Sequence, residues 1–379
     1  MPNCYNCKTE LTESNKSKEH IILNALGGRL KSSDLLCIKC NSDMGSSCDG
    51  VLAKQFALIS AILDISRERK EIPIIKGGKL KDGTEVNLLN GNTPRLANPK
   101  LESRKIEGGV EYKIVARDEK EMQQLLSSIK KNHPLFDIDK AMDSAKNKKS
   151  SLKQPITYQQ VFGGVEAFRS IAKTAINYYI YRKGNPENIV ELIPFLLGKN
   201  EMDIVKHFHP NKSIYKKESN EVIHLIHLVG NKHSKTLYCY IEFFSSHSYL
   251  VTLSLDYNGP NISHTYAYDL LNNKEVTRVV QLKLKRDFLI NLNTSFDDFP
   301  IVQEKMNRLL KIAHQRQLQK EQNRIIENAS NEIFATKYKN EKVISEIMMH
   351  EFIDKVATEI AYLWHGERVQ TFGDMIDNN

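Results

Sequence analysis

The chain has 379 residues, of which 40% are hydrophobic and 26% charged, a composition typical of a globular protein with two or three domains. No run of about eighteen apolar residues occurs, which excludes a membrane span. The first residues show no apolar core of a secretory signal, so we expect a cytoplasmic protein. The formal net charge of +8 is compatible with a polyanionic partner, although charge alone does not identify one.

Four of the six cysteines form two Cys-x-x-Cys pairs, Cys4 with Cys7 and Cys37 with Cys40. In a reducing compartment such pairs indicate a metal site rather than disulfides, and four thiolates form the tetrahedral shell of structural zinc. Free thiols in a small core are the alternative. Because four thiolates leave no position open for water, we predict that this zinc stabilises the fold and takes no part in chemistry.

Between the cysteine pairs the pattern predicts a strand, a loop and a second strand, and a helix follows the second pair. Residues 17–23 (SKEHIIL) are strand-like and contain the adjacent residues Glu19 and His20. The loop bends at Gly27-Gly28. Apolar residues at spacings of four, three and four predict an amphipathic helix that reaches about residue 65.

The next part of the chain predicts short strands, one helix and a linker. Residues 71–117 are rich in glycine, asparagine and lysine, and 111–118 (EYKIVARD) is strand-like. Residues 119–132 predict a helix. The polar, lysine-rich stretch 141–155 is interpreted as a mobile linker. Its lysines could contact a phosphate backbone or simply be solvated.

A second domain is predicted from about Ile156. It starts with an amphipathic helix at 165–181 and a second helix up to Leu197. Strand candidates separated by short loops then predict an antiparallel meander, and a further candidate follows. These candidates lie at 221–229, 236–244, 248–257 and 264–270. From about Ile301 the chain predicts helices.

Several other residues are candidates for a functional role. No histidine spacing in the strand region closes a metal site with a carboxylate, so we interpret these histidines as core or surface residues: His224, His227, His233, His247 and His264. The tyrosines of the same region could stack nucleic-acid bases, but packing on a sheet is the simpler explanation. Trp364 is predicted to lie in a core. The helix at 302–326 could pair with a second copy or lie on DNA.

The N-terminal pattern "CxxC … EHII … ALGG … CxxCN" over residues 4–56 resembles the zinc-stapled HNH endonucleases of the ββα-metal (His-Me finger) superfamily. The resemblance covers under a fifth of the chain. It implies that His20 is the general base and that Glu19 and Asn41 hold one divalent cation, Mg²⁺ or Mn²⁺. Such a site would hydrolyse a phosphodiester by in-line attack of water.

Three positions depart from the family pattern, and one geometric condition applies. Glu19 stands where aspartate is commoner, and Leu23 stands where proline is usual. The middle asparagine is replaced by Ser32, Ser33 or Asp34. Adjacent residues of an ideal strand face opposite ways. Glu19 and His20 therefore serve one site only if the backbone departs from ideal there, or if the metal bridges the strand edge.

These observations predict an α+β protein in three parts. They are a zinc-stapled HNH nuclease domain at 1–70, a small α/β connector with a lysine-rich linker at 71–150, and an α+β regulatory or substrate-selecting domain at 151–379. The first hypothesis is a metal-dependent endonuclease that cuts DNA, similar to prokaryotic restriction and anti-phage effectors. We expect a homo-oligomer, most simply a dimer, and a small ligand or partner protein could activate it. The alternative is a zinc-stapled DNA-binding or regulatory protein with a vestigial nuclease site.

Overall fold

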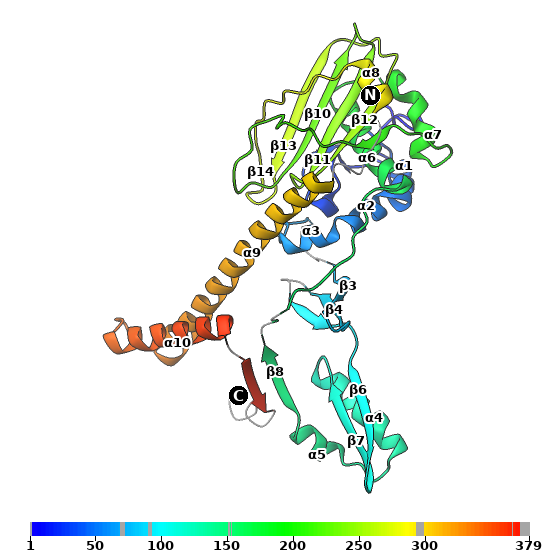
Figure 1. Cartoon of the computed structure of the whole chain (residues 1–379). Helices are drawn as coiled ribbons and strands as arrows, with labels where there is room; N and C mark the ends of the chain where they lie inside the picture. Colours follow the sequence, from blue (N-terminus) through cyan, green and yellow to red (C-terminus); the bar gives the residue numbers. More distant parts are fainter. Residues whose placement is uncertain are drawn as a thin grey trace. The chain divides into compact units, whose positions relative to one another are not determined.

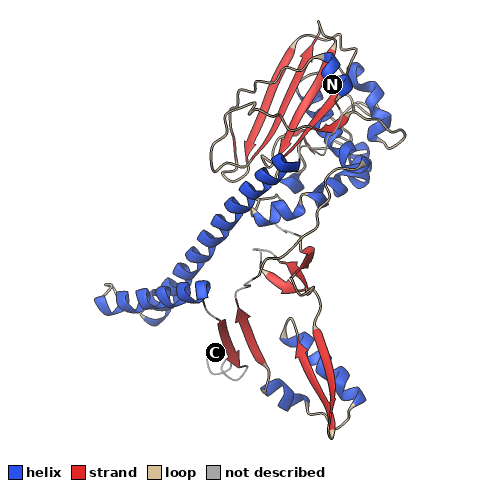
Figure 2. Ribbon diagram, viewed as in Figure 1, coloured by secondary structure: helices blue, strands red, loops and turns tan. Residues whose placement is uncertain are grey.

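The computed structural model describes residues 2–68, 73–89, 93–150, 152, 154–292, 299–365 and 367–371. The chain forms two compact units, and each combines separate stretches of sequence. Unit 1 contains Met1–Pro73 and Gln160–His314, and unit 2 contains Ile74–Gln159 and Gln315–Asn379. The predicted mixture of helices and antiparallel strands, with helices towards the C-terminus, is confirmed (Figure 1, Figure 2). Among the described residues, no helix has the length and apolar character needed to cross a membrane.

Unit 1 consists of an N-terminal ββα segment, a six-stranded sheet and the helices that pack on the sheet. The N-terminal elements are β1 (Glu19–His20), η1 (Asn24–Leu26), β2 (Lys31–Ser32), α1 (Ile38–Met44), η2 (Gly45–Asp49), α2 (Gly50–Gln55) and α3 (Ala57–Ile62). The helices of the later part are α6 (Val165–Tyr181), η3 (Pro186–Leu192), α7 (Ile193–Leu196), α8 (Arg286–Asn291) and the start of α9 (Phe299–Ser330). Its strands are β9 (Val205–His207), β10 (Ile223–Asn231), β11 (Thr236–Phe243), β12 (His247–Ser254), β13 (Ile262–Asp269) and β14 (Lys274–Glu275).

The N-terminal segment has the predicted order of strand, loop, strand and helix. Strands β1 and β2 pair antiparallel, with Glu19 opposite Ser32. The turn η1 ends at Gly27, whose φ of 92° lies in the left-handed region that favours glycine. The predicted helix up to about residue 65 is present in two pieces, since Phe56 separates α2 from α3, and it ends at Ile62.

The strands of the sheet follow the order β14-β13-β10-β11-β12-β9. The first three candidates form the predicted meander β10-β11-β12, and helix α6 has the bounds expected from the sequence. The fourth candidate is a strand too, but β13 returns to the free edge of β10 instead of following β12. The predicted helix up to Leu197 starts as the 3₁₀ helix η3 and becomes α-helical only in α7.

Each face of the sheet is buried, and successive side chains alternate between the two faces. Ile226 and Leu228 of β10 belong to a large core that also contains α6 and the buried residues of the ββα segment. Ile223 and Leu225 of the same strand belong to a second core, which includes Leu289 of α8. The ββα segment therefore shares its core with α6 and the sheet.

Unit 2 contains three small sheets and several helices. Its elements are β3 (Ile75–Lys79), β4 (Glu85–Leu88), β5 (Pro94–Leu96), β6 (Lys100–Ile106), β7 (Gly109–Val115), α4 (Glu119–Asn132), α5 (Ile138–Asp143), β8 (Lys146–Ser150), the end of α9, η5 (Asn331–Lys337), α10 (Glu346–His365) and β15 (Glu367–Thr371). The predicted helix at 119–132 is α4. The side chain of Trp364, predicted to lie in a core, is outside the described part of the structure.

The lysine-rich stretch interpreted as a mobile linker contains a strand. Strand β8 pairs antiparallel with β15, and Lys148 lies opposite Val369. The pairing joins segments more than two hundred residues apart, so no local pattern could predict it. The roles predicted for the segments 1–70, 71–150 and 151–379 stay predictions.

Candidate active site and zinc centre

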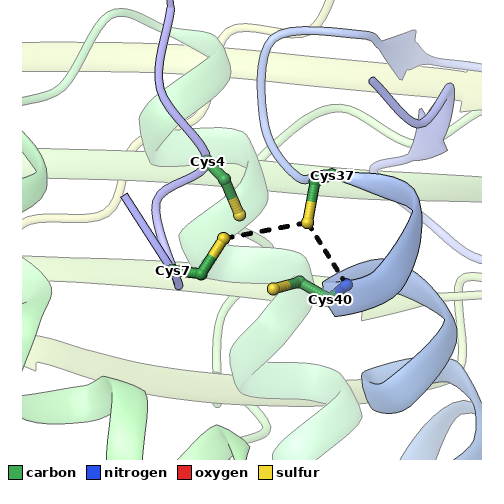
Figure 3. Close-up of side chains that lie close together, drawn as sticks. All are labelled: Cys4, Cys7, Cys37 and Cys40. Atoms are coloured by element: carbon green, nitrogen blue, oxygen red, sulfur yellow. Dashed lines mark hydrogen bonds between the residues drawn. The ribbon is translucent and has the colours of Figure 1, made fainter. Parts of the chain in front are cut away.

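The four cysteines predicted to bind zinc lie together at the start of α1. Their sulfur atoms are all within 4.8 Å of one another (Figure 3), and the sulfurs of Cys7 and Cys37 are 3.8 Å apart. Two sulfurs on one tetrahedral zinc ion lie about 3.8 Å apart, because the Zn–S distance is about 2.3 Å. The cluster could therefore hold a structural zinc ion, which would connect the N-terminal loop to α1.

The next residue of α1 after the last cysteine is Asn41, and its side chain faces the interior of unit 1. Its Nδ2 donates to Ser17 Oγ at 2.6 Å, which orients Oδ1 inward. Asn41 Oδ1 lies 3.4 Å from Nζ of Lys173 in α6. Glu19 Oε1 lies 2.8 Å from the same nitrogen. The two residues predicted to share a cation therefore converge on one point, and that point is an ammonium group.

A third oxygen atom at this point, which the sequence did not reveal, belongs to Asp49. Its Oδ2 lies 2.7 Å from Lys173 Nζ, and its Oδ1 accepts a hydrogen bond of 2.6 Å from Ser170 Oγ. In a continuous α-helix, residues eight apart differ by about 80° around the axis. The π-helical segment η2 rotates by a smaller angle per residue, and this brings Asp49 towards the helix face that carries Asn41. Such π segments occur frequently at functional sites.

Helix α6 provides further polar groups on the inner side of Glu19. Asn177 Nδ2 lies 3.4 Å from Glu19 Oε1, and Asn177 Oδ1 accepts a hydrogen bond of 2.9 Å from the Tyr5 hydroxyl. Two members of the group are buried, since Glu19 is 6% exposed and Lys173 only 2%. In this structure α6 covers the inner side of Glu19, whereas Asn41 and Asp49 are half-buried.

The electrostatics of this group keep the ammonium charged. Burial acts to lower the pKa of Lys173, but the carboxylates of Asp49 and Glu19 outweigh burial, so its pKa is raised. Burial raises the pKa of Glu19, and the Lys173 ammonium acts against that rise. Two acidic side chains thus contact one ammonium.

His20 faces away from this group. Its ring Nε2 lies 3.5 Å from Glu68 Oε2, and the same carboxylate contacts Lys31 and, at 4.0 Å, Arg29. Burial and the charge of Lys31 lower the pKa of His20, while Glu68 acts in the opposite direction. The imidazole is therefore neutral near pH 7, which is the form that a general base requires.

The structure thus brings Glu19 and Asn41 together and directs His20 to the other face of β1. This follows from the alternation of side chains along a strand, and the short strand β1 shows no bulge between the two residues. His20, Arg29 and Lys31 converge on a carboxylate in the manner in which they could converge on a phosphate group.

The position of the missing middle asparagine is occupied by β2 and the residues after it. Ser32 pairs with Glu19, its hydroxyl accepts from the backbone N–H of Asp34 at 3.1 Å, and Asp34 lies 3.6 Å from Lys183. The loop is held by its backbone instead: Gly28 N donates to Leu23 O at 3.1 Å. A backbone hydrogen bond therefore closes the loop although the middle asparagine is missing.

The histidines of the sheet do not gather into a metal site. Among the described residues, the cysteine quartet is the group of three or more histidine, cysteine or acidic side chains that could hold a metal. His224, His227 and His247 are buried and His233 is exposed, in agreement with their interpretation as core and surface residues. Burial lowers the pKa of His224 and of His227 to about 4.

A short ββα unit with four clustered thiols, and with inward-facing oxygen atoms of Glu19 on its strand and Asn41 on its helix, defines the class of this N-terminal segment. Comparison with protein families agrees: the HNH endonuclease family model matches residues 4–57. Neither the curated proteins nor the solved structures contain a match to the chain. The predicted resemblance is therefore confirmed for the N-terminal segment, and the matched family model ends at residue 57.

Proposed function

We propose that the protein is a metal-dependent HNH endonuclease that hydrolyses phosphodiester bonds of DNA. The observation that carries the proposal is the convergence of Glu19 and Asn41 on one point beside a thiol cluster, within the segment that matches the nuclease family. The carboxylate and amide oxygens, with Asp49 as a third ligand, are the hard donors that Mg²⁺ and Mn²⁺ prefer. A divalent cation bound there would stabilise the charge that develops on the cleaved phosphate.

His20 is the proposed general base. Its neutral ring can accept the proton of the attacking water at the nitrogen that now faces Glu68. Arg29 and Lys31 flank the same position and would bind the phosphate once Glu68 moves aside. Because His20 and Glu19 face opposite sides of β1, action at one phosphate requires a rearrangement of β1, or a substrate that reaches across the strand edge.

The first prediction concerns His20. In a plasmid-nicking assay with Mg²⁺ or Mn²⁺, the His20→Ala variant should lose cleavage by about 100-fold or more, the contribution typical of a general base. Zinc content and DNA affinity should stay close to wild type, because a general base acts in the transition state and not in binding. Wild-type cleavage rates in this variant would contradict the assignment.

A vestigial site is the second candidate, and the Lys173 ammonium favours it by filling the predicted cation position. The same assay separates the two candidates. A wild-type chain that binds DNA but nicks it at no concentration of Mg²⁺ or Mn²⁺ would be a zinc-stapled DNA-binding or regulatory protein.

We further propose that residues 151–379 control the nuclease, as in restriction and anti-phage effectors. Helix α6 supports this proposal because it belongs to the later part of the chain and covers the candidate site. A bound ligand or a partner protein could act through α6. The exposed apolar residues Ile347, Met349 and Ile353 of α10 support pairing of two copies.

A further inference from the structure

The side chain of Lys173 occupies the position in which the proposed cation would bind. A lysine ammonium has three N–H donors, and Nζ has three oxygen neighbours: Glu19 Oε1 at 2.8 Å, Asp49 Oδ2 at 2.7 Å and Asn41 Oδ1 at 3.4 Å. Its hydrogen bonds are therefore complete. The same three oxygens are the ones that a divalent cation would need.

The three oxygens are suitable ligands for a divalent cation, but they cannot bind the cation and the ammonium at the same time. Mg²⁺ requires ligand distances near 2.1 Å, whereas the oxygens now stand at hydrogen-bond distances from a nitrogen. A divalent ion at their centre would meet the ammonium at close range, between the buried side chains of Glu19 and Lys173. Like charges repel strongly under such conditions. The ammonium and the metal ion therefore exclude each other.

We propose that Lys173 is an intramolecular competitor of the divalent cation: the site holds either the ammonium of α6 or the metal. The inference rests on the proposed function in so far as Glu19 and Asn41 are the cation ligands. It adds a residue that lies outside the segment matching the nuclease family and 124 positions beyond Asp49. In this structure the ammonium holds the site, and metal can enter only when Lys173 leaves.

Removal of the ammonium should thus raise the affinity for metal. The test uses the full-length, zinc-loaded protein and Mn²⁺ as the probe, with free Mn²⁺ measured by electron paramagnetic resonance. Lys173→Met keeps most of the side-chain length without charge. We expect it to bind one additional Mn²⁺ about tenfold or more tightly than wild type, because one positive charge beside the ion is removed. Glu19→Gln combined with Lys173→Met should lose this gain.

Lys173→Met leaves Glu19 and Asp49 without the ammonium and could therefore fail to fold, so a second variant is needed. Asp49→Asn combined with Lys173→Met removes one negative and one positive charge, so the group keeps the net charge of wild type. This variant should still bind Mn²⁺ more tightly than wild type, because the oxygens of Glu19 and Asn41 no longer contact an ammonium. Zinc content and thermal unfolding show which variants are folded. The proposal is wrong if folded variants bind Mn²⁺ no better than wild type, or if wild type binds it as tightly through Glu19.

The nicking assay, run in parallel, distinguishes this inference from the proposed function. A gain of Mn²⁺ affinity without cleavage by any variant would support the competition and contradict the endonuclease. Cleavage by wild type that depends on His20 would support the endonuclease. If Lys173→Met and its combination with Asp49→Asn then bound Mn²⁺ no more tightly than wild type, the competition would be contradicted.

Discussion

Gly28 lies against the backbone carbonyl of Ile22, in the loop that connects the two strands of the ββα segment. A Cβ atom at this position would come within 1.9 Å of the Ile22 oxygen, a contact that only a backbone shift can relieve. Gly27 beside it has a φ of 92°, and a Cβ there would approach Ile65 Cγ2 to 2.5 Å. The glycine pair therefore allows the loop to fold back on its own strand, close to Glu19 and His20.

Gly28→Ala should consequently destabilise the protein by about 2 kcal/mol or more, the upper range for forced overpacking. Gly50→Ala is the matched control: it lies at the start of α2, where a Cβ would meet nothing within 4 Å. Alanine is preferred in a helix by roughly 0.5–1 kcal/mol, so the control should be neutral or slightly stabilising. Thermal unfolding of both variants measures the difference, and equal midpoints would contradict the packing argument.

Among the site residues, the sequence predicted those whose spacing carries chemistry. The cysteine quartet follows from two short motifs, whereas the role expected of Asn41 follows from the resemblance to HNH endonucleases. Lys173 and Asp49 could not be predicted. Their convergence depends on the π segment η2 and on the packing of α6 against the ββα segment, and neither leaves a local signal. Glu19 and His20 face opposite ways because side chains alternate along a strand. The sequence already indicates this alternation as an obstacle to a shared site.

Strand β10 contacts the ββα loop through a buried histidine. His224 Nε2 lies 2.9 Å from Leu26 O, and its Nδ1 accepts from the backbone N–H of Phe244 at 3.3 Å. The ring must therefore be neutral with its proton on Nε2. Burial lowers the pKa of His224 to about 4, so protonation is incompatible with this arrangement near neutral pH.

His224 should make the stability of unit 1 depend on pH. The unfolded chain takes up a proton near pH 6.5 and the folded chain only near pH 4, so the free energy of unfolding falls as the pH drops between these values. The loss attributable to one histidine is roughly 3 kcal/mol. His224→Gln keeps a donor for Leu26 O but cannot titrate. It should therefore lose less stability than wild type between pH 7 and pH 4.5 in urea unfolding.

His233→Gln is the control for this measurement, because His233 is exposed. It should show the same pH dependence as wild type. Other buried histidines, among them His227 and His247, also have lowered pKa values because of burial, so a residual dependence should persist in His224→Gln. If the free energy of unfolding of His224→Gln depended on pH as steeply as that of wild type, His224 would not contribute to the pH dependence.

Elements with a strong local period were predicted well. The apolar stripe of α6 gave its bounds, and the alternation of β10, β11 and β12 gave three neighbouring strands. The return of β13 to β10 and the pairing of β8 with β15 were not predicted. Both are contacts between distant segments, and they depend on which strand edges stay free.

The whole chain is organised as one discontinuous unit interrupted by another. Unit 1 leaves off at Pro73 and resumes at Gln160. The N-terminal segment contributes Phe56, whose ring lies 5.5 Å from Phe243 and 5.6 Å from Phe244 in the sheet region. The Tyr5 hydroxyl adds a buried hydrogen bond of 2.9 Å to Asn177 of α6. The core of the N-terminal ββα segment is therefore completed by the later part of the chain.

The last prediction follows from this shared core. Residues 1–73 alone expose the apolar surface that packs on α6 and the sheet, so even with zinc they should not form a stable fold. Residues 1–73 joined to 160–314 should fold. In unit 2, Lys79 and Thr157 form an antiparallel bridge, which brings the two ends of the intervening segment together. A flexible linker of about 12 residues should therefore replace it, given about 3.5 Å for each extended residue.

Far-UV circular dichroism, thermal unfolding and zinc content should show a cooperative, zinc-bound protein for the joined chain and an unfolded or aggregated one for 1–73. A cooperative zinc-dependent transition in isolated 1–73 would instead show that the ββα segment is an independent domain, and that α6 covers its site without being part of its fold.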